Sequence, residues 1–349
     1  QKYIDRQPVS QINSEFEDLE ESKEPIPLKQ NSGLSFRGTI ILGMGFTISP
    51  KQKDDLILLD ERYEKYIEPY MGGDELNHSP GLTHHRYVIN LDDLELEEAK
   101  KLPDLIKIVQ TEVKPSRDKI KGESDIQRKR KNFWWKYGGT ANNMNRAISN
   151  MERCIACSSV TKQLVFGFQP TNKVFANSLA VFALDRFFHF AVLQSSVHYH
   201  WAMKMGSRMG KALRYTPSTI FETLPLPRVS ESIERELADK GKVLHDARLD
   251  YMKRYQIGMT ETWNRILESN NKHFNDSDIE ELRTKFYEMD FVVLKAYGWD
   301  DLEPTDDKKI IDRIRKLNVE RALEEVIAEY ECLQRLIDLG TSHIQGLNK

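Results

Sequence analysis

The stretch SFRGTIILGMGFTISPKQKDDLILLD, residues 35–60, joins an apolar strand pattern to two glycines and the start of a helix. Ser49 and Pro50 are typical of a helix N-cap and first turn, so we expect a helix to run from there to about residue 60. This order of strand, glycine turn and helix places the stretch at the beginning of a mixed α/β region.

The same order is found in nucleotide-cofactor loops. Such a site also needs a second, parallel strand that ends in an acidic residue about 20 residues later. The following sequence, RYEKYIEPYMGGDEL (62–76), has Pro69 and two glycines in its place. We therefore predict that Gly43 and Gly45 shape the backbone, with a cofactor loop as the alternative.

Beyond this stretch, strand and helix patterns alternate as far as Pro225 and Pro227, and helical spacing follows. The strand patterns cover 85–92, 153–160 and 164–170, and the apolar stretch 178–206 predicts one or two buried helices. Helices are expected at 231–255, from a capping box at Ser277, and as a pair over 305–339. The predicted fold class is α+β, a mixed α/β domain followed by an all-helical C-terminal domain.

The length of 349 residues favours more than one domain. We predict an acidic linker or arm over 1–32, a mixed domain over 33–228 and a helical domain over 229–349. Because the sequence begins with Gln1 and not with Met, we also expect it to be part of a longer protein.

Charge is distributed unevenly along the chain. Residues 101–228 contain 21 Lys and Arg against 8 Asp and Glu, whereas residues 1–100 contain 11 against 20 and residues 229–349 contain 19 against 26. A basic block between two acidic flanks is typical of a surface for an anionic partner, most commonly nucleic acid.

The candidate contacts lie in two parts of this block. Basic side chains can neutralise phosphates and aromatic rings can stack on bases. In segment 114–137 the candidates are Lys114, Arg117, Arg128, Lys129, Arg130, Lys131, Trp135 and Lys136, and further along they are Lys162, Arg208, Lys211 and Arg214. The alternatives are a solvated basic loop held by core tryptophans and, at 201–218, a flexible structural loop.

Two other groups of residues contain side chains that can bind metal ions. Asp74, Glu75, His78, His84 and His85 lie close in sequence, but their spacing matches no known ligand set, so a surface loop is the better interpretation.

The cysteines do not indicate a zinc site either. Cys154 and Cys157 fall in a strand pattern that directs their thiols to opposite faces, and no second CxxC exists. An odd total of three, with Cys332, favours a reducing compartment, which makes the cytoplasm the expected location. No apolar run is long enough to span a bilayer and no signal peptide is present, so no membrane partner is expected.

Several longer motifs together resemble a known family. LGMGFTI, PYMGGDEL, YVINLDDLELEEAKKLPDLIKIV, RKNFWWKY, FAVLQSSVHYHWA and RYTPSTIFETLPLP resemble the target-recognition domain of MmeI-like Type II restriction-modification DNA adenine methyltransferases. The motifs IGMTETWNRILES and DIEELRTKFYEMDFVVLKAYGWDDL resemble the helical C-terminal domain of these enzymes. The resemblance covers about residues 35–330.

This resemblance implies a parent enzyme that recognises a short sequence in double-stranded DNA and transfers a methyl group from S-adenosylmethionine to adenine N6. The catalytic domain would lie N-terminal to this part in the same polypeptide. Neither its cofactor motif nor an Asn/Asp-Pro-Pro-Tyr/Phe box is present, so no catalytic residue and no cofactor are expected in this chain. Two other functions stay open: a complete enzyme that binds S-adenosylmethionine at Gly43–Gly45, and a protein-interaction module that docks through its acidic helical tail.

Overall fold

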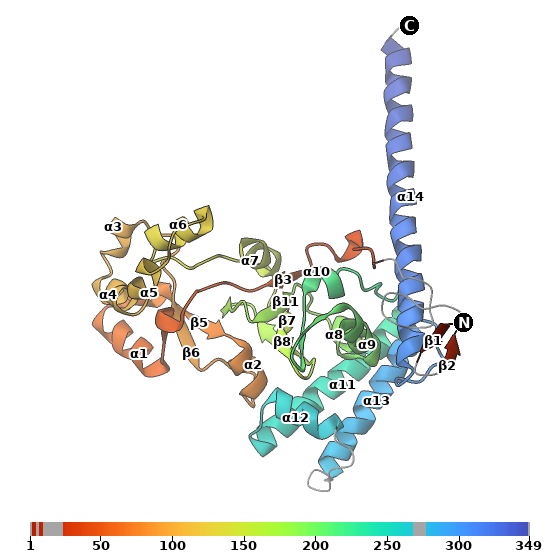
Figure 1. Cartoon of the computed structure of the whole chain (residues 1–349), viewed down its shortest axis with the longest axis horizontal. Coiled ribbons are helices and arrows are strands. Elements are labelled where there is room, and N and C mark those ends of the chain that lie inside the picture. Colours follow the sequence, from red (N-terminus) through yellow and green to blue (C-terminus); the bar gives the residue numbers. More distant parts are fainter. Residues whose placement is uncertain (1, 5–6, 10–23, 268–276, 348–349) are drawn as a thin grey trace.

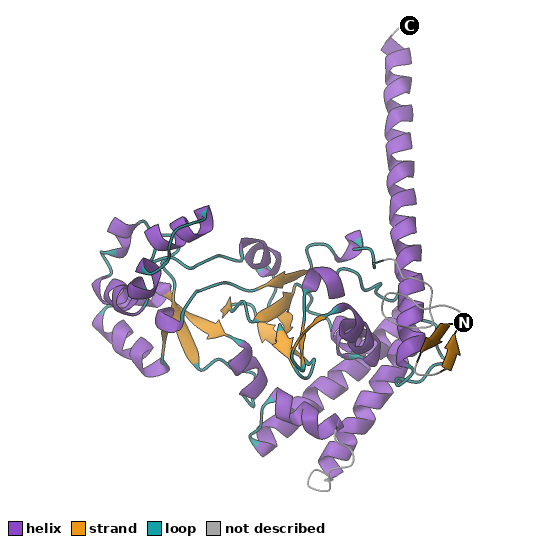
Figure 2. Cartoon of the chain, in the orientation of Figure 1, coloured by secondary structure: helices purple, strands orange, loops and turns teal. Residues whose placement is uncertain are grey.

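The computed structural model describes residues 2–4, 7–9, 24–267 and 277–347. These residues form a mixed α/β body and a helical region, from which one long helix projects (Figure 1). Strands occupy the middle of the body and helices surround them (Figure 2). The predicted α+β class is confirmed. Among the described helices, none combines the length and apolar character that a membrane crossing requires.

The first sheet has the strand order β10-β5-β6-β4. The strands are β4 (Thr47–Ile48), β5 (Ile67–Met71), β6 (Arg86–Ile89) and β10 (Val174–Phe175). The helical elements of this part are η2 (Met44–Phe46), α1 (Pro50–Leu59), η3 (Glu61–Tyr66), α3 (Leu96–Ala99), α4 (Pro103–Glu112), α5 (Lys114–Asp118) and α6 (Asp125–Asn132). The strand pattern at 85–92 is confirmed by β6.

The opening stretch folds as its local chemistry predicts. Ser49 Oγ accepts a hydrogen bond from the backbone N–H of Gln52, and Gln52 Oε1 accepts one from the N–H of Ser49, so a capping box starts α1. Gly43 has a φ of 108°, and a Cβ at Gly45 would lie 2.7 Å from the carbonyl oxygen of Glu112. These glycines therefore shape the backbone, as predicted. The geometry does not favour the cofactor alternative, because β4 pairs antiparallel with β6, and β6 separates it from β5, the strand that follows α1.

The second sheet has the strand order β3-β11-β7-β9, with all neighbours antiparallel. Its strands are β3 (Ser35–Arg37), β7 (Arg153–Ser158), β9 (Phe166–Pro170) and β11 (Leu179–Phe182). The strand patterns at 153–160 and 164–170 are confirmed. The first strand is shorter than predicted, because after Gly38 the chain turns to make bridges at Thr39 and Ile40.

Successive residues of the second sheet point into two different cores, as strand geometry requires. Cys157 packs into a core with helices α8 (Phe187–Gln194) and α9 (Ser196–Met205). Cys154 packs into a core on the other face, together with residues of α2 (Gly73–His78), α7 (Asn142–Ile148) and α12 (Met259–Leu267). The prediction that the two thiols lie on opposite faces is confirmed. The two buried helices predicted within 178–206 are α8 and α9.

A third, small sheet has the order β12-β13-β8. Its strands are β8 (Val160–Thr161), β12 (Ser207–Met209) and β13 (Ala212–Arg214), and the short α10 (Pro217–Ile220) follows. The segment predicted as a possible flexible loop therefore contains an ordered hairpin.

The C-terminal region consists of α11 (Glu231–Tyr255), α12, α13 (Ser277–Ala296) and α14 (Asp307–Leu347). One face of α13 is apolar and is buried at Ile279, Leu282, Met289 and Val293. The prediction of two helices over 305–339 is wrong, since α14 is a single helix of 41 residues. The physical reason is that no Pro or Gly interrupts the chain between 307 and 339.

Part of the predicted N-terminal arm packs against the body. Near the N-terminus, β1 (Lys2–Ile4) pairs antiparallel with β2 (Gln7–Val9), whereas 5–6 and 10–23 lie outside the described residues. Leu28 is buried just before η1 (Lys29–Asn31). The domain limits at 32 and 228 stay predictions. Helix α11, which follows residue 228, packs into the same core as α8, which precedes residue 228.

Candidate nucleic-acid interface

The hairpin of β12 and β13, which pairs with β8, carries exposed basic residues. Arg208 lies opposite Leu213, and Arg214 lies opposite both Ser207 and Val160. Because neighbouring strand residues point to opposite faces, Arg208 and Arg214 project from the two faces of one ribbon. Both are exposed, whereas Leu213 is buried and anchors the ribbon to the body.

The tip of the ribbon and its neighbour strand add two further cations. Gly210 has a φ of 61°, which permits the tight turn, and the exposed Lys211 follows it. Lys162 is exposed directly after β8. The structure thus places the four basic residues predicted at 162–214 on one small sheet. A two-stranded ribbon has the dimensions that fit the major groove of B-form DNA.

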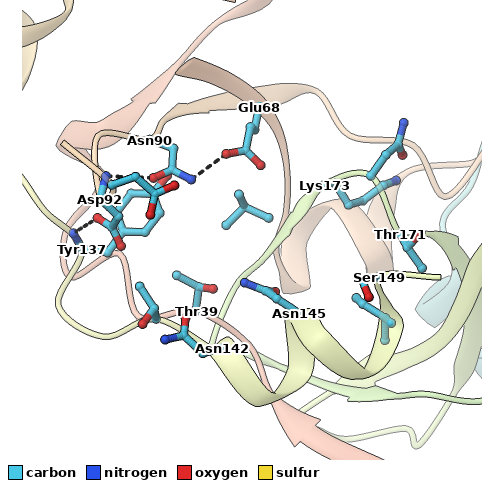
Figure 3. Close-up of a pocket in the computed structure, with 15 residues that line it drawn as sticks. Thr39, Glu68, Asn90, Asp92, Tyr137, Asn142, Asn145, Ser149, Thr171 and Lys173 are labelled. Carbon is cyan, nitrogen blue, oxygen red and sulfur yellow. Dashed lines mark hydrogen bonds between the residues drawn. The ribbon is translucent and has the colours of Figure 1, made fainter. Parts of the chain in front are cut away.

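A polar cavity of about 420 Å³ lies where the first and second sheets meet (Figure 3). The chain passes from one sheet to the other at this point, because β9 belongs to the second sheet and β10 to the first. The side chains that line the cavity include Thr39, Glu68, Asn90, Asp92, Tyr137, Asn142, Asn145, Ser149, Thr171 and Lys173.

One side of the cavity is held by internal hydrogen bonds. Asn90 Nδ2 donates to Glu68 Oε1 over 2.6 Å, and Asp92 Oδ1 accepts from the backbone N–H of Tyr137 over 2.6 Å. The other side carries Asn142 and Asn145 (Figure 3). Both are exposed, and within the described part of the chain neither side chain has a hydrogen-bond partner. Their amide groups are therefore available to a ligand.

Burial shifts the pKa of two groups in the cavity. It raises the pKa of Asp92 from 3.8 to about 6, and it lowers the pKa of Lys173. Lys173 Nζ donates to Gln169 Oε1 over 3.1 Å. Amide, carboxyl and ammonium groups are the side chains that read the edges of base pairs, so the lining is chemically suited to that task.

Comparison with known proteins places these features in a family. Residues 21–228, which contain both the ribbon and the cavity, match the family described as MmeI, target recognition domain. The chain belongs to the MmeI target-recognition-domain family. The resemblance found in the sequence is confirmed. No curated protein matches the chain.

The fold of the family is confirmed by a solved structure of the Type IIL restriction-modification enzyme MmeI in complex with DNA. The two structures superpose with a TM-score of 0.68 at 16% sequence identity, over 90% of this chain and 39% of the solved chain. The present chain therefore spans about two fifths of the length of that protein. At this identity the similarity concerns the fold.

One predicted contact residue of this MmeI-family domain is buried. Arg117 is 1% exposed and donates from Nη2 to the carbonyl oxygens of Ile41 and Lys136, each over 3.2 Å. Burial also lowers its pKa. The prediction that Arg117 contacts DNA is wrong for this structure, because its guanidinium group joins two loops inside the domain.

The structure also contradicts the predicted contact of Trp135 with DNA. Its ring is 4% exposed, and Nε1 donates to the carbonyl oxygen of Leu94 over 3.0 Å. A ring buried in this way cannot stack on a base. The alternative interpretation, in which core tryptophans hold the basic segment, applies to this residue.

The remaining basic residues predicted in segment 114–137 lie at the surface of α5, α6 and the turn that follows. Several of them form ion pairs or hydrogen bonds within the protein. Lys114 pairs with Asp118, Lys136 with Glu95, and Arg128 with Asp125. Arg130 donates to the carbonyl of Gly138, and Lys131 donates to that of Ile120. Lys129 is exposed on α6. Such surface contacts are weak enough to be exchanged for phosphates.

The acidic and histidine residues of 74–85 form an ion-pair group. Glu75 is buried and accepts a hydrogen bond of 2.5 Å from Arg86 Nε, while His78 contacts Asp74 over 2.8 Å. Glu75 therefore lies in the interior and not on a surface loop. Among the described residues, no group of three or more His, Cys, Asp or Glu is placed to hold a metal ion.

Sequence reasoning missed the polar cavity. In the sequence, Lys173 contributes only to the charge of the basic block, and no motif distinguishes Asn142 and Asn145 as binding residues. The lining comes from separate segments between Thr39 and Val174, so no local spacing reveals it. The only available signal was the cluster of asparagines at 142–145.

Proposed function

We propose that this chain recognises a specific sequence in double-stranded DNA. In this proposal it is the specificity part of an S-adenosylmethionine-dependent N6-adenine methyltransferase of a restriction-modification or phage-defence system. The observation that carries the proposal is the ribbon with cations on both faces, in a chain of the MmeI target-recognition family. The related MmeI structure was solved in complex with DNA.

The division of labour follows from what the residues can do. Recognition needs phosphate and base contacts, which the ribbon, α6 and the cavity can supply. Methyl transfer belongs, in the proposal, to a domain that precedes this part in the same polypeptide and binds S-adenosylmethionine there. The whole enzyme would work in the cytoplasm, where the DNA is found.

Two classes of contact are proposed within the interface. Cations follow the phosphates and fix the position of the duplex, without reading its sequence. The residues for this role are Lys114, Arg128, Lys129, Arg130, Lys131, Lys136, Lys162 and Lys211. Arg208 and Arg214 can enter the major groove, where an Arg that pairs with guanine discriminates between bases by about 1–3 kcal/mol.

The experiment measures duplex binding by fluorescence anisotropy across a range of salt concentrations. The binding constant should fall steeply as salt increases, because each neutralised phosphate releases a counterion. The triple variant Arg208→Glu, Lys211→Glu and Arg214→Glu should lower the affinity by at least 100-fold at low salt and make the salt dependence shallower.

A matched triple variant on α11 controls for net charge. Arg235→Glu, Lys242→Glu and Lys253→Glu make the same change in charge at exposed positions outside the ribbon. This variant should keep nearly all the affinity. Equal losses in the two variants, or binding that is insensitive to salt, would contradict the proposed interface.

A further inference from the structure

An apolar cavity of about 270 Å³ lies between α9, α12, α13 and the segment that leads into α14. The rings of Tyr199, Trp263, Phe286 and Tyr287 line it, and those of Trp263 and Phe286 meet edge to face with centroids 4.9 Å apart. An apolar cavity of about 150 Å³ holds one benzene ring. This larger cavity therefore has room for a molecule of one or two rings.

The exposure of the lining residues shows which end of the apolar cavity is open. Leu267 and Tyr287 are 47% and 50% exposed, so they lie at the mouth. Asp290 is fully buried and Ser196 is 9% exposed, which places both at the inner end. A ligand would have its ring against the apolar wall and its polar group at this inner end.

Other buried polar side chains at the cavity already have partners in the protein. Gln194 Oε1 accepts a hydrogen bond from the backbone N–H of Phe166 over 3.0 Å. Arg283 donates from Nε to the carbonyl oxygen of Ile266 over 2.8 Å and from Nη2 to that of Arg265 over 2.6 Å. These groups therefore need no hydrogen bond from a ligand.

Asp290 and Ser196 differ from the other polar residues of the lining. Asp290 Oδ1 accepts from the backbone N–H of Ser196 over 2.8 Å, which holds the two residues side by side. Among the described residues, neither Asp290 Oδ2 nor Ser196 Oγ has a partner in hydrogen-bond geometry. Burial raises the pKa of Asp290, and the N–H and hydroxyl of Ser196 oppose this only in part. An unpaired buried polar atom is costly, so a ligand that pairs with both atoms would bind favourably.

We propose that the apolar cavity binds a small, neutral aromatic molecule whose edge carries an N–H donor beside a carbonyl group, as in an aromatic carboxamide. The N–H would donate to Asp290 Oδ2, and the carbonyl oxygen would accept from Ser196 Oγ. The ring would pack against Trp263 and Phe286, because aromatic rings favour edge-to-face and offset contacts. Arg283 in the wall disfavours a cationic ligand, which is why the donor belongs to a neutral group.

Such a ligand would join two parts of the protein. Helix α9 belongs to the mixed body, whereas α12 and α13 belong to the C-terminal region, and all three line the cavity. A molecule that binds only when these helices are in place stabilises the folded chain. The proposal is independent of DNA recognition, since the apolar cavity shares no residue with the ribbon or with the polar cavity.

The test compares benzamide with acetophenone by isothermal titration calorimetry on the full chain without DNA. The two probes have the same shape, but acetophenone has a methyl group in place of the amide NH2, so it can only accept. The titrations are made at pH 8, above the pKa of about 7 that burial gives Asp290. The wild-type chain should bind benzamide at least tenfold more tightly than acetophenone.

Two variants assign the two hydrogen bonds. Asp290→Asn keeps the shape of the side chain but presents NH2 where the acceptor was. It should weaken benzamide binding at least tenfold and leave acetophenone binding unchanged, so that the preference disappears. Ser196→Ala should weaken both probes alike, by about fivefold, because both carry the carbonyl group.

The matched control is Asp250→Asn on α11. Asp250 is exposed and does not line the apolar cavity, so this variant should bind both probes like the wild type. Circular dichroism checks the fold of each variant, and if Asp290→Asn did not fold, the wild-type preference and Ser196→Ala would decide. A wild-type chain that does not bind benzamide, or that binds both probes equally, would overturn the proposal. A preference for benzamide that persists in a folded Asp290→Asn variant would overturn it as well.

Discussion

Asp290 in α13 accepts a 2.8 Å hydrogen bond from the backbone N–H of Ser196, the first residue of α9. Both residues are buried, so this contact joins the C-terminal helices to the mixed body inside one core. Asp290 also lies near the positive end of α9, where a carboxylate is favoured, yet burial dominates and raises its pKa from 3.8 to about 7.

The raised pKa predicts a pH-dependent stability. Between about pH 4 and 7 the unfolded chain releases this proton while the folded chain retains it, so rising pH lowers the free energy of unfolding. Asp290→Asn removes the titration. We expect the difference in unfolding free energy, wild type minus variant, to fall by about 1–3 kcal/mol between pH 4.5 and 7.5 in urea titrations. The exposed Asp250→Asn on α11 is the control, and an equal pH trend in both variants would contradict the assignment.

Gly38 is expected to tolerate no side chain. A Cβ at this position would lie 2.2 Å from the carbonyl oxygen of Ala176 and 2.4 Å from that of Phe175, and both are backbone atoms that cannot move aside cheaply. Gly38→Ala should therefore lower the free energy of unfolding by about 3 kcal/mol or more.

Gly139 supplies the comparison for Gly38. A Cβ there would meet only Ile40, at 3.6 Å or more, which is an ordinary contact. We expect Gly139→Ala to change the unfolding free energy by less than about 1 kcal/mol. Thermal denaturation of the two variants would measure both changes in stability. A similar loss in both variants would contradict the close approach of the backbone at Gly38.

Arg117 and Lys129 should separate folding from DNA contact. Arg117→Ala leaves a cavity and two unpaired carbonyl groups, so we expect it to destabilise the domain by about 2–4 kcal/mol. Below its melting temperature this variant should bind DNA like the wild type. Lys129→Glu should weaken DNA binding at unchanged stability, because the residue is exposed. Chemical denaturation and anisotropy on both proteins would measure the two effects, and the reverse pattern would restore Arg117 as a contact.

The polar cavity is expected to influence which sequence is chosen. Base-contacting groups alter selectivity when removed, whereas phosphate-contacting groups weaken all sequences alike. We expect Asn142→Ala with Asn145→Ala to change the bases enriched from a random duplex library at little cost in overall affinity. Asn143→Ala, on the same helix but not lining the cavity, should enrich the wild-type sequence. If the wild type, the double variant and Asn143→Ala all enriched the same bases, the cavity would not take part in sequence recognition.

Local chemistry made much of the fold predictable. Ser49 and Gln52 fix the start of α1 through bonds only three residues apart, and the alternation of Cys154 and Cys157 follows from strand geometry alone. The family could also be read from motifs in the sequence. Charge counts correctly found the basic third of the chain, since they depend on composition and not on contacts.

The sequence did not predict which basic or aromatic side chains are buried and which are exposed. Arg117 and Lys129 are equally cationic in the sequence, yet one joins two loops in the interior and the other faces solvent. Burial depends on what packs against a side chain, and for Arg117 the partners are Ile41 and Lys136, one of them 76 residues away. The cavity was hidden for the same reason.

The sequence by itself determined where α1 begins, where β6, β7 and β9 lie, that the thiols of Cys154 and Cys157 lie on opposite faces, and that positive charge gathers in the middle third. These properties depend on residues a few positions apart, whose interactions form in any context. Only the tertiary structure decided that Arg208 and Arg214 leave opposite faces of one ribbon, that Asn145 and Asp92 line the same cavity, and that Trp135 is buried. Those outcomes depend on which distant segments share a core, a choice made by the packing of the whole chain.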